Sequence, residues 1–392
     1  MGRWPRVRLE ELTKVVAMGP FGSSIKVETF VPVGVPVISG QHLHGWTLDS
    51  TPGFNFVTSE HADRLRNANV GPGDVVFTHA GNIGQVAMVP RSPDYPRYVI
   101  SQRQFYARCD ESRLLPEFLV AFFKTANGRH QLLANASQVG VPSLARPVTY
   151  LRGVEVPAPP IRVQRRIADI LGALNDKIEL NRQVANTLDS VCQSLFAGLI
   201  SGRQPETGES STLGAEFEVT MGQSPPGNTY NTDGVGSPFY QGRVDFGFRY
   251  PSRRVYCTSP TRMARAGDVL LSVRAPVGDI NIAAEPCAIG RGLAAIRHRV
   301  AGSAYTYETL RALRSALEIF NGEGTVFGAI GGSQLKGLRV SSPPRSVIAA
   351  FESSIRPVEE RLGLIDSESR QLAEVRDSLL PRLLSGELEV AA

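Results

Sequence analysis

Two stretches of the chain carry apolar residues at steps of mostly three and four, which is the spacing of a coiled-coil seam. The first seam consists of Ile167, Leu171, Leu174, Ile178, Leu188, Val191, Leu195 and Leu199. The second, 184 positions later, consists of Phe351, Ile355, Val358, Leu362, Leu372, Val375, Leu379 and Leu383. Each stretch follows a Pro-Pro pair and ends at a Ser-Gly pair, which are typical helix boundaries. The pattern predicts long helices within residues 157–202 and 341–392.

Two polar residues interrupt the seams, Asn181 in the first and Ser369 in the second. Asn181 either fixes the register of a helix pair or faces solvent where the seam drifts, and the sequence leaves both open. Pro357 should kink the second helix or delay its start. Each helix is amphipathic and needs a partner, and the simplest partner is the other helix. A two-fold-like arrangement of the halves would make the helices antiparallel, although periodicity alone does not give their direction.

The helices belong to a longer internal repeat. The offset of 184 also aligns Pro159-Pro160 with Pro343-Pro344, whereas upstream Met18-Gly19 matches Met221-Gly222 at an offset of 203. The changing offset places insertions before the helices, in segments that tolerate them as loops do. The predicted order is a first domain (residues 1–156), a helix (157–202), a linker (203–211), a second domain (212–340) and a helix (341–392).

The segments before the helices combine short apolar runs with Gly and Pro punctuation. Strands are predicted at residues 36–38, 74–77, 85–89 and 268–271, and short helices at 117–125 and 307–320. The predicted fold class is α+β. It has two tandem mixed α/β domains, separated by two long helices that form an antiparallel coiled coil, with a pseudo-two-fold internal repeat.

The positive charge of the chain lies in the two domains. The 392 residues have a net charge of +5. Residues 1–156 carry 16 Lys and Arg against 12 Asp and Glu, and residues 212–340 carry 14 against 10, so each domain has +4. The first helix with its linker is neutral, and the second helix is acidic. This distribution favours two surfaces that meet a polyanion.

The sequence offers little that resembles a catalytic or metal site. It has no Gly-x4-Gly-Lys-Ser/Thr loop, no Asn/Asp-Pro-Pro-aromatic tetrapeptide and no Gly-x-Ser-x-Gly elbow. The glycine-rich residues 322–332 are better interpreted as a turn before the second helix. Neither the cysteines nor the histidines have the spacing of metal ligands; they are Cys109, Cys192, Cys257, Cys287, His42, His44, His61 and His79. We therefore expect no catalytic residue, no metal and no cofactor in this chain.

The ordered motifs resemble the specificity subunits of type I restriction-modification systems. The run that begins at Ile161 after the Pro-Pro pair, IRVQRRIA, is similar to the start of that family's constant helix. GPFGSSI from Gly19, GPGDV from Gly71 and AGDVLLS from Ala266 are similar to its target-recognition domains. The order domain, helix, domain, helix covers essentially the whole chain. The chain departs from the family near the Pro-Pro pairs, where it keeps Gln164 but lacks the usual acidic residue.

The resemblance implies that each domain reads one half of a split, asymmetric site in double-stranded DNA. The helices would space the halves and dock two methyltransferase subunits, which would use S-adenosylmethionine. Separate restriction subunits would supply ATP- and Mg-dependent translocation and cleavage. The chain shows neither the apolar run of a signal peptide nor a stretch long enough to span a membrane, so a cytoplasmic location without a membrane partner is expected.

Candidate DNA contacts are chosen by side-chain chemistry, because Arg, Lys, Asn and Gln can read base edges. They are Lys26, Gln41, Asn82 and Arg103 in the first domain and Tyr230, Gln241, Arg243, Arg274 and Arg291 in the second. Other interpretations stay open: an enzyme with a methyltransferase or nuclease centre hidden in one domain, the specificity subunit of a related methyltransferase–nuclease system, or a coiled-coil adaptor that binds only proteins.

Overall fold

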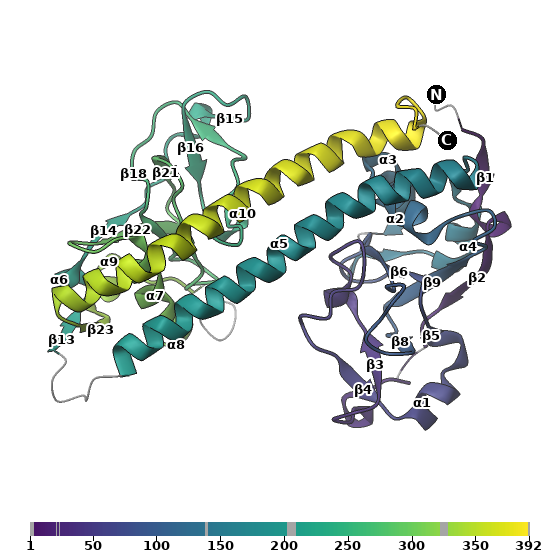
Figure 1. Cartoon of the computed structure of the whole chain (residues 1–392), viewed down its shortest axis with the longest axis horizontal. Coiled ribbons are helices and arrows are strands. Elements are labelled where there is room, and N and C mark those ends of the chain that lie inside the picture. Colours follow the sequence, from purple (N-terminus) through teal and green to yellow (C-terminus); the bar gives the residue numbers. More distant parts are fainter. Residues whose placement is uncertain are drawn as a thin grey trace. The chain divides into compact units, whose positions relative to one another are not determined.

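A computed structural model describes residues 4–390, except 21, 23, 138–139, 202–208 and 322–327. The chain forms two compact units, the first made of residues 1–178 and 371–392 and the second of residues 179–370 (Figure 1). Most of the predicted linker, the first part of the glycine-rich segment, and Phe21 and Ser23 of the first motif lie outside the described residues.

The two predicted long helices are α5 (Ile161–Ser201) and α10 (Arg345–Ser385), each 41 residues long. Both begin directly after the Pro-Pro pairs, as the sequence predicts. The predicted delay at Pro357 is wrong, because α10 starts twelve residues before it. Pro357 and Ser353 are both exposed, so water can hydrate the Ser353 carbonyl that loses its helical partner.

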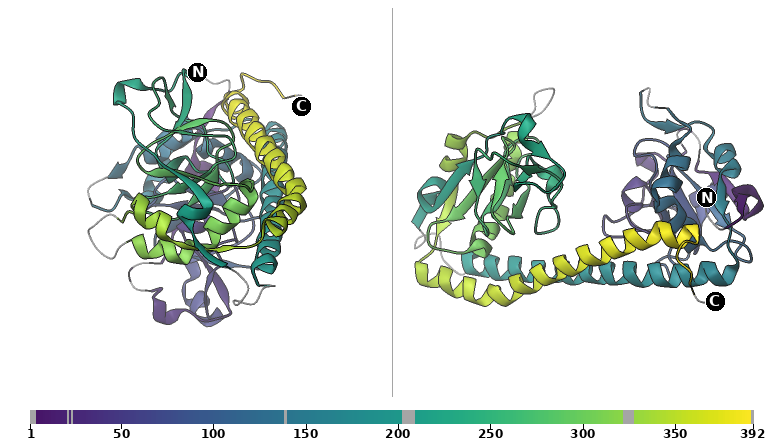
Figure 2. Two further views of the ribbon diagram at one scale, coloured as in Figure 1. Left: turned by 90° about the vertical axis from the view of Figure 1, so that its left-hand side faces the viewer. Right: turned by 90° about the horizontal axis from the view of Figure 1, so that it is seen from above.

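Within each unit, a segment of α5 packs on a segment of α10 in the opposite direction (Figure 2). In the second unit, the ring of Phe196 lies 5.6 Å from that of Phe351. Nearer the start of α5, Asn181 is buried and donates to Glu368 Oε2 at 2.9 Å and Ser369 Oγ at 3.2 Å. In the first unit, Asn175 accepts from Arg376 at 2.9 Å. The partner numbers rise on α10 as they fall on α5, so the helices are antiparallel. Asn181 bonds across the pair, and its solvent-facing alternative is wrong.

The predicted seam is wrong at three positions. Val191, Leu195 and Val375 are 42%, 45% and 47% exposed. The seam of α5 instead follows Asn181, Ala185, Leu188, Cys192, Phe196 and Leu199. These steps average 3.6 residues, the repeat of a straight α-helix, whereas the prediction assumed the 3.5-residue repeat of a supercoiled pair.

The other seam residues are buried or half-buried. Those that are buried are Ile167, Leu171, Phe351, Ile355, Leu362 and Leu383, and those that are half-buried are Leu174, Ile178, Leu188, Leu199, Val358, Leu372 and Leu379. Near the C-terminal end of α10, Leu380 and Leu384 are buried as well, in the core of the first domain. The ends of the helices therefore pack on the domains and not only on one another.

The first domain has two four-stranded sheets. One has the order β2–β9–β6–β7, with β2 (Thr13–Met18), β9 (Gln104–Cys109), β6 (Val75–Thr78) and β7 (Val86–Met88), all antiparallel. The other has the order β4–β3–β8–β5, with β4 (Asn55–Val57), β3 (Val35–Ile38), β8 (Tyr98–Ile100) and β5 (Asn69–Val70). Strands β3 and β8 pair in parallel.

The second domain repeats this topology and adds one strand, β15 (Tyr230–Asn231), at the edge of its second sheet. Its antiparallel sheet has the order β14–β22–β19–β20, with β14 (Phe217–Met221), β22 (Leu293–His298), β19 (Val269–Ser272) and β20 (Ile280–Ile282). Its second sheet has the order β15–β17–β16–β21–β18, with β15 (Tyr230–Asn231), β17 (Tyr256–Cys257), β16 (Ser237–Tyr240), β21 (Cys287–Ile289) and β18 (Met263–Ala264). The parallel pair β16–β21 corresponds to β3–β8, so the internal repeat is confirmed.

Short elements join each domain to its helix. Strand β1 (Arg6–Arg8) pairs with β12 (Glu155–Pro157), and β13 (Glu209–Thr212) pairs with β23 (Arg339–Ser342), which closes each domain before its long helix. The remaining elements are α1 (Ser59–Arg64), α2 (Pro116–Lys124), α3 (Ala126–Leu133), β10 (Ala136–Ser137), β11 (Ser143–Leu144), α4 (Pro147–Gly153), α6 (Leu213–Glu216), α7 (Ser303–Ala312), α8 (Arg314–Glu318) and α9 (Gly332–Gly337). The predicted helix 307–320 is thus two helices. None of the described helices is long and apolar enough to cross a membrane.

Gln164 fixes the first domain to α5. Its side chain is fully buried, accepts from the Leu115 amide at 2.8 Å, and donates to the carbonyls of Arg113 and Pro159 at 2.8 and 2.9 Å. In the second unit, Glu352 of α10 accepts from the Tyr305 amide at 2.8 Å. Both side chains bind the backbone at the start of the helix that follows β9 or β22, so each long helix is held by an equivalent polar contact.

Candidate nucleic-acid interface

Three loops of the first domain meet at one edge of its sheets. They follow β3, connect β6 to β7, and connect β8 to β9. The Ser101 amide donates to the Ile38 carbonyl at 2.9 Å, and the His79 amide donates to the Arg103 carbonyl at 2.9 Å. The parallel pairing of β3 with β8 brings their carboxyl ends to the same edge. The loops therefore form one continuous surface, here called the recognition edge, which consists of residues 39–42, 79–85 and 101–103.

A glycine lies against the β8–β9 turn in the first domain and against its counterpart in the second. A Cβ atom on Gly19 would collide with the carbonyl oxygen of Ser101, and one on Gly222 would collide with that of Gly290. Only glycine allows this close approach of two backbone segments. This requirement explains why the glycine of the Met-Gly pair recurs in both halves of the sequence.

Three of the four candidates in the first domain lie on the recognition edge. Gln41 is exposed in a short 3-10 helix, Gly40–His42, and Asn82 and Arg103 are exposed on the neighbouring loops. Lys26 is also exposed, but its loop is fixed to α1 by the hydrogen bond between His61 and the Ser24 carbonyl at 2.8 Å. The structure thus brings Gln41, Asn82 and Arg103 together and does not place Lys26 with them.

Sequence reasoning missed several polar side chains of this edge. Gln85 lies 3.4 Å from the His44 ring nitrogen, and His79 bonds the Gln102 carbonyl at 3.0 Å. Desolvation by burial lowers the pKa of His79, which keeps its ring neutral near pH 7, able to donate or accept. The available signal was the clustering of Gln, His and Asn around glycines in residues 79–85.

The second domain presents an equivalent edge with different chemistry. Register pairs Ile38 with Ile100 and Tyr240 with Ile289. By counting from these pairs, Gln41 corresponds to Arg243, and Gln102 to Arg291. Arginine suits guanine and glutamine suits adenine in the major groove. The two edges therefore share a backbone frame and offer different contacts to bases.

The candidates of the second domain fall into two groups. Gln241, Arg243, Arg274 and Arg291 are exposed on loops of the edge. Tyr230 is half-buried in β15; its hydroxyl donates to the Pro225 carbonyl at 2.7 Å, and its ring lies 4.8 Å from Phe239. These contacts favour a packing role for Tyr230 over a base contact.

The histidines and cysteines do not gather into a metal site in the part of the chain that is described. His42 is buried, stacks on Phe54 at 4.4 Å, and bonds the Gly53 carbonyl at 2.9 Å. All four cysteines are buried free thiols. The arrangement at the two edges is that of exposed hydrogen-bonding side chains on loops, which suits binding.

Comparison with known proteins gives a consistent result. Residues 1–190 match the family described as the type I restriction modification DNA specificity domain. The chain is 25% identical to a putative type I restriction enzyme MjaX specificity subunit of Methanocaldococcus jannaschii, across 99% of this chain and 94% of that protein. It is 21% identical to the HindI specificity subunit of Haemophilus influenzae, across 81% of this chain and 86% of that protein. The crystal structure of a type I S subunit from M. genitalium has the same fold, with a TM-score of 0.60 at 15% identity over 100% of this chain and 97% of that one.

Proposed function

This chain belongs to the family of type I restriction-modification specificity subunits, and we propose that its two recognition edges each read one half of a bipartite DNA site. The observation that carries this proposal is the repeated edge. The same loops recur on the same strands in both domains, yet Gln41 and Gln102 of one edge are replaced by Arg243 and Arg291 in the other. An asymmetric site needs two binding domains of this kind, with the same backbone fold and different base-contacting side chains.

The helices offer a surface for partner subunits. Leu180, Val184, Val191 and Leu195 are between 37% and 53% exposed on α5. Residues four and eleven positions apart fall on one face of a helix, so these four form an apolar stripe beside the seam. Continuous exposed apolar surface marks protein interaction sites. The stripe supports docking of a methyltransferase subunit on the second unit.

The family role supports a proposal for the partner subunits and their cofactors. A specificity subunit is non-catalytic. We propose that two methyltransferase subunits bind S-adenosylmethionine and methylate adenine, and that restriction subunits use ATP and Mg²⁺ to translocate and cleave DNA. The complex would act in the cytoplasm on double-stranded DNA.

The direct test maps methylated adenines after the chain is combined with its methyltransferase subunits. Gln41→Ala should relax recognition in one half of the methylated motif, and Arg291→Ala should relax it in the other. Each lost bidentate contact is worth about 1–3 kcal/mol of discrimination. Lys26→Ala, a change at an exposed cation away from the edge, is the control and should leave both halves intact.

Two further measurements and one outcome of this mapping separate the competing interpretations. Methylation by the purified chain without partners would support a hidden enzyme centre. A chain that fails to bind DNA at moderate salt would be an adaptor that binds only proteins. Relaxation of the same half-site by both edge substitutions would refute the assignment of one half-site to each domain.

A further inference from the structure

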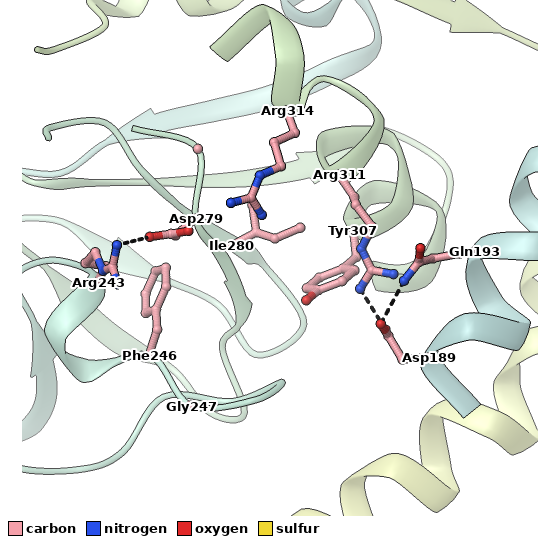
Figure 3. A pocket seen from close by; sticks show the side chains of 11 residues that line it. Asp189, Gln193, Arg243, Phe246, Gly247, Asp279, Ile280, Tyr307, Arg311 and Arg314 are labelled. Carbon is pink, nitrogen blue, oxygen red and sulfur yellow. Dashed lines mark hydrogen bonds and ion pairs between the residues drawn. The ribbon is translucent and has the colours of Figure 1, made fainter. Parts of the chain in front are cut away.

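The second unit contains a cavity of about 590 Å³ between the recognition edge and α5 (Figure 3). Three arginines line it, Arg243, Arg311 and Arg314, together with the rings of Phe246 and Tyr307. We propose that this cavity binds a phosphate of the DNA backbone next to the bases that the second domain reads. This inference rests on the proposed function and extends it from base reading to a sequence-independent anchor.

Arg243 connects the cavity to the recognition edge. It begins a 3-10 helix, Arg243–Asp245, which two residues separate from the end of β16. Its Nη1 lies 3.0 Å from Asp279 Oδ2, and the side chains are 57% and 30% exposed. Exposed ion pairs contribute little to stability, so Arg243 can leave the carboxylate and contact DNA at the edge. A duplex on the edge would then already lie against one wall of the cavity.

Arg311 has hydrogen-bonding capacity left over. It donates to Asp189 Oδ1 at 2.7 Å, as Figure 3 shows. Its Nη1 atom is buried and has no hydrogen-bond acceptor among the described residues; the nearest carboxylate of an ion pair, that of Glu308, is 3.4 Å away. Glu308 balances this group by charge rather than by a hydrogen bond, and Arg311 itself lines the cavity, so its guanidinium contributes positive charge to the site.

Arg314 is the most adaptable of the three cations. It is the first residue of α8 and 67% exposed, and its ion pair with Glu318 lies within the same helix at 3.3 Å. In Figure 3 its side chain extends from the helix toward Ile280 and Asp279. A guanidinium can grip a phosphate with two parallel hydrogen bonds. Arg314 is therefore the side chain whose loss should weaken phosphate binding with the least damage to folding.

The charge balance favours an anion that is delivered by a polymer. The lining contains three arginines and the carboxylates of Asp189 and Asp279, and Asp189 also pairs with buried Arg249 at 3.0 Å. The balance of the lining is +1, which attracts an anion only weakly. Asp279 holds Arg243 and at the same time repels phosphate. The half-buried ring of Phe246 suits the deoxyribose that separates successive phosphates.

The test compares Arg314→Ala with Arg253→Ala in the full chain bound to its methyltransferase partners. Arg253 is a matched control, because it is 56% exposed and pairs with Glu285, which follows β20 at the end away from the recognition edge. One lost phosphate contact lowers the slope of log affinity against log salt by about 0.9. When salt is raised from about 50 to 200 mM, the factor by which DNA affinity falls should therefore be about 3 times smaller for Arg314→Ala than for wild type. The methylated motif should not change, and Asp279→Asn should bind DNA more tightly than wild type.

Three results would overturn the inference. In the first, Arg314→Ala matches Arg253→Ala in DNA affinity and in salt slope while wild type still binds DNA. This result would refute phosphate binding in the cavity and would leave the proposed function unaffected. The methylated motif could change, which makes Arg314 a base reader. Arg314→Ala could lose binding of pyrophosphate yet keep full DNA affinity, which makes the cavity a site for a free nucleotide. Weak, salt-independent DNA binding by wild type itself would instead refute the proposed function.

Discussion

Replacing Arg249 should destabilise the second unit more than any other single change of a charged side chain that we consider. The Arg249 side chain is 1% exposed, and it joins three elements. Its guanidinium lies 3.0 Å from Asp189 of α5, pairs with Glu359 of α10, and stacks over the Tyr307 ring of α7 at 3.8 Å. Arg249→Met keeps most of the volume and removes the charge.

The magnitude follows from which carboxylate loses its partner. Asp189 keeps Arg311 at 2.7 Å, so only Glu359 is left unpaired, with its side chain 15% exposed. Removing one partner of a buried ion pair costs about 3–5 kcal/mol. Because Asp189 keeps its pair with Arg311, we expect a loss at the lower end of this range, about 3 kcal/mol. In the double variant Arg249→Met/Glu359→Met no isolated charge remains, and most of the loss should be recovered.

Urea unfolding followed by two probes isolates the effect. Both tryptophans, Trp4 and Trp46, belong to the first unit, so their fluorescence reports that unit, whereas far-UV circular dichroism reports the whole chain. The substitution should lower the midpoint measured by dichroism and shift the tryptophan transition less. A loss below about 1 kcal/mol, the worth of an exposed pair, would contradict the argument, and so would a double variant as unstable as the single one.

Four further predictions test other parts of the molecule. Burial raises the pKa of Glu308 to about 7 from 4.5, so the folded state holds a proton that the unfolded state releases and stability should fall as pH rises from about 4.5 to 7, by at most about 3 kcal/mol; Glu308→Gln should remove this fall in thermal melts. Replacing residues 212–340 with a relative's second domain should change one half of the methylated motif, and a change in both halves would contradict independent reading. Four residues inserted after Ala185 lengthen α5 by about 6 Å, which is nearly two base steps of roughly 3.4 Å. The spacer length preferred in a library of split sites should therefore shift, whereas the same insertion near Gly208 of the linker should not shift it. An active variant that keeps the original spacer preference would refute the idea that the helix sets the spacing. Leu195→Glu should weaken co-purification of the methyltransferase subunit while the chain stays folded, and undiminished co-purification would remove the docking stripe.

The helices could be predicted from sequence because their boundaries are local. Pro-Pro pairs stop the preceding strand, Ser-Gly pairs end the helix, and the apolar pattern in between is long. The seam was harder to predict, since repeats of 3.5 and 3.6 residues diverge by about 20° per heptad. Val191 and Leu195 fit a repeat of 3.5 residues, but the helix follows a repeat of 3.6 residues, which leaves both side chains exposed. An apolar residue on a helix that has more than one partner does not reveal which partner it faces.

The recognition edge could be predicted as a set of residue types but not as a surface. Exposed Gln, Asn and Arg beside glycines are a local signal, and most of the chosen residues lie at the edges. Which of them meet depends on the parallel pairing of β3 with β8, which no local pattern specifies. Arg249 gave no signal at all, because arginine is almost never fully buried unless it is paired, and its partners lie 60 and 110 positions away in the sequence.

Arg249 and Trp46 occupy the same place in the repeat. The Trp46 carbonyl accepts from the Met88 amide of β7, and the Arg249 carbonyl accepts from the Ile282 amide of β20, at 2.9 and 2.8 Å. Trp46 places its ring against Arg376 of α10 at 5.8 Å, whereas Arg249 places its cation against the Tyr307 ring. The same backbone position thus supplies one member of a cation–aromatic contact in each domain. It supplies the ring in the first domain and the cation in the second.

This inversion limits how domains can be exchanged. A replacement of residues 212–340 carries position 249 and Tyr307 with it but leaves Asp189 and Glu359 in the helices. A donor domain with tryptophan at position 249 would leave Glu359 buried without a cation, which costs about 3–5 kcal/mol. Donors with arginine there should give folded, active chimeras, and Glu359→Met should rescue the others. The recognition loops can therefore differ freely between relatives. The loop that carries position 249 must instead suit the residues of the long helices that it contacts, Asp189 and Glu359.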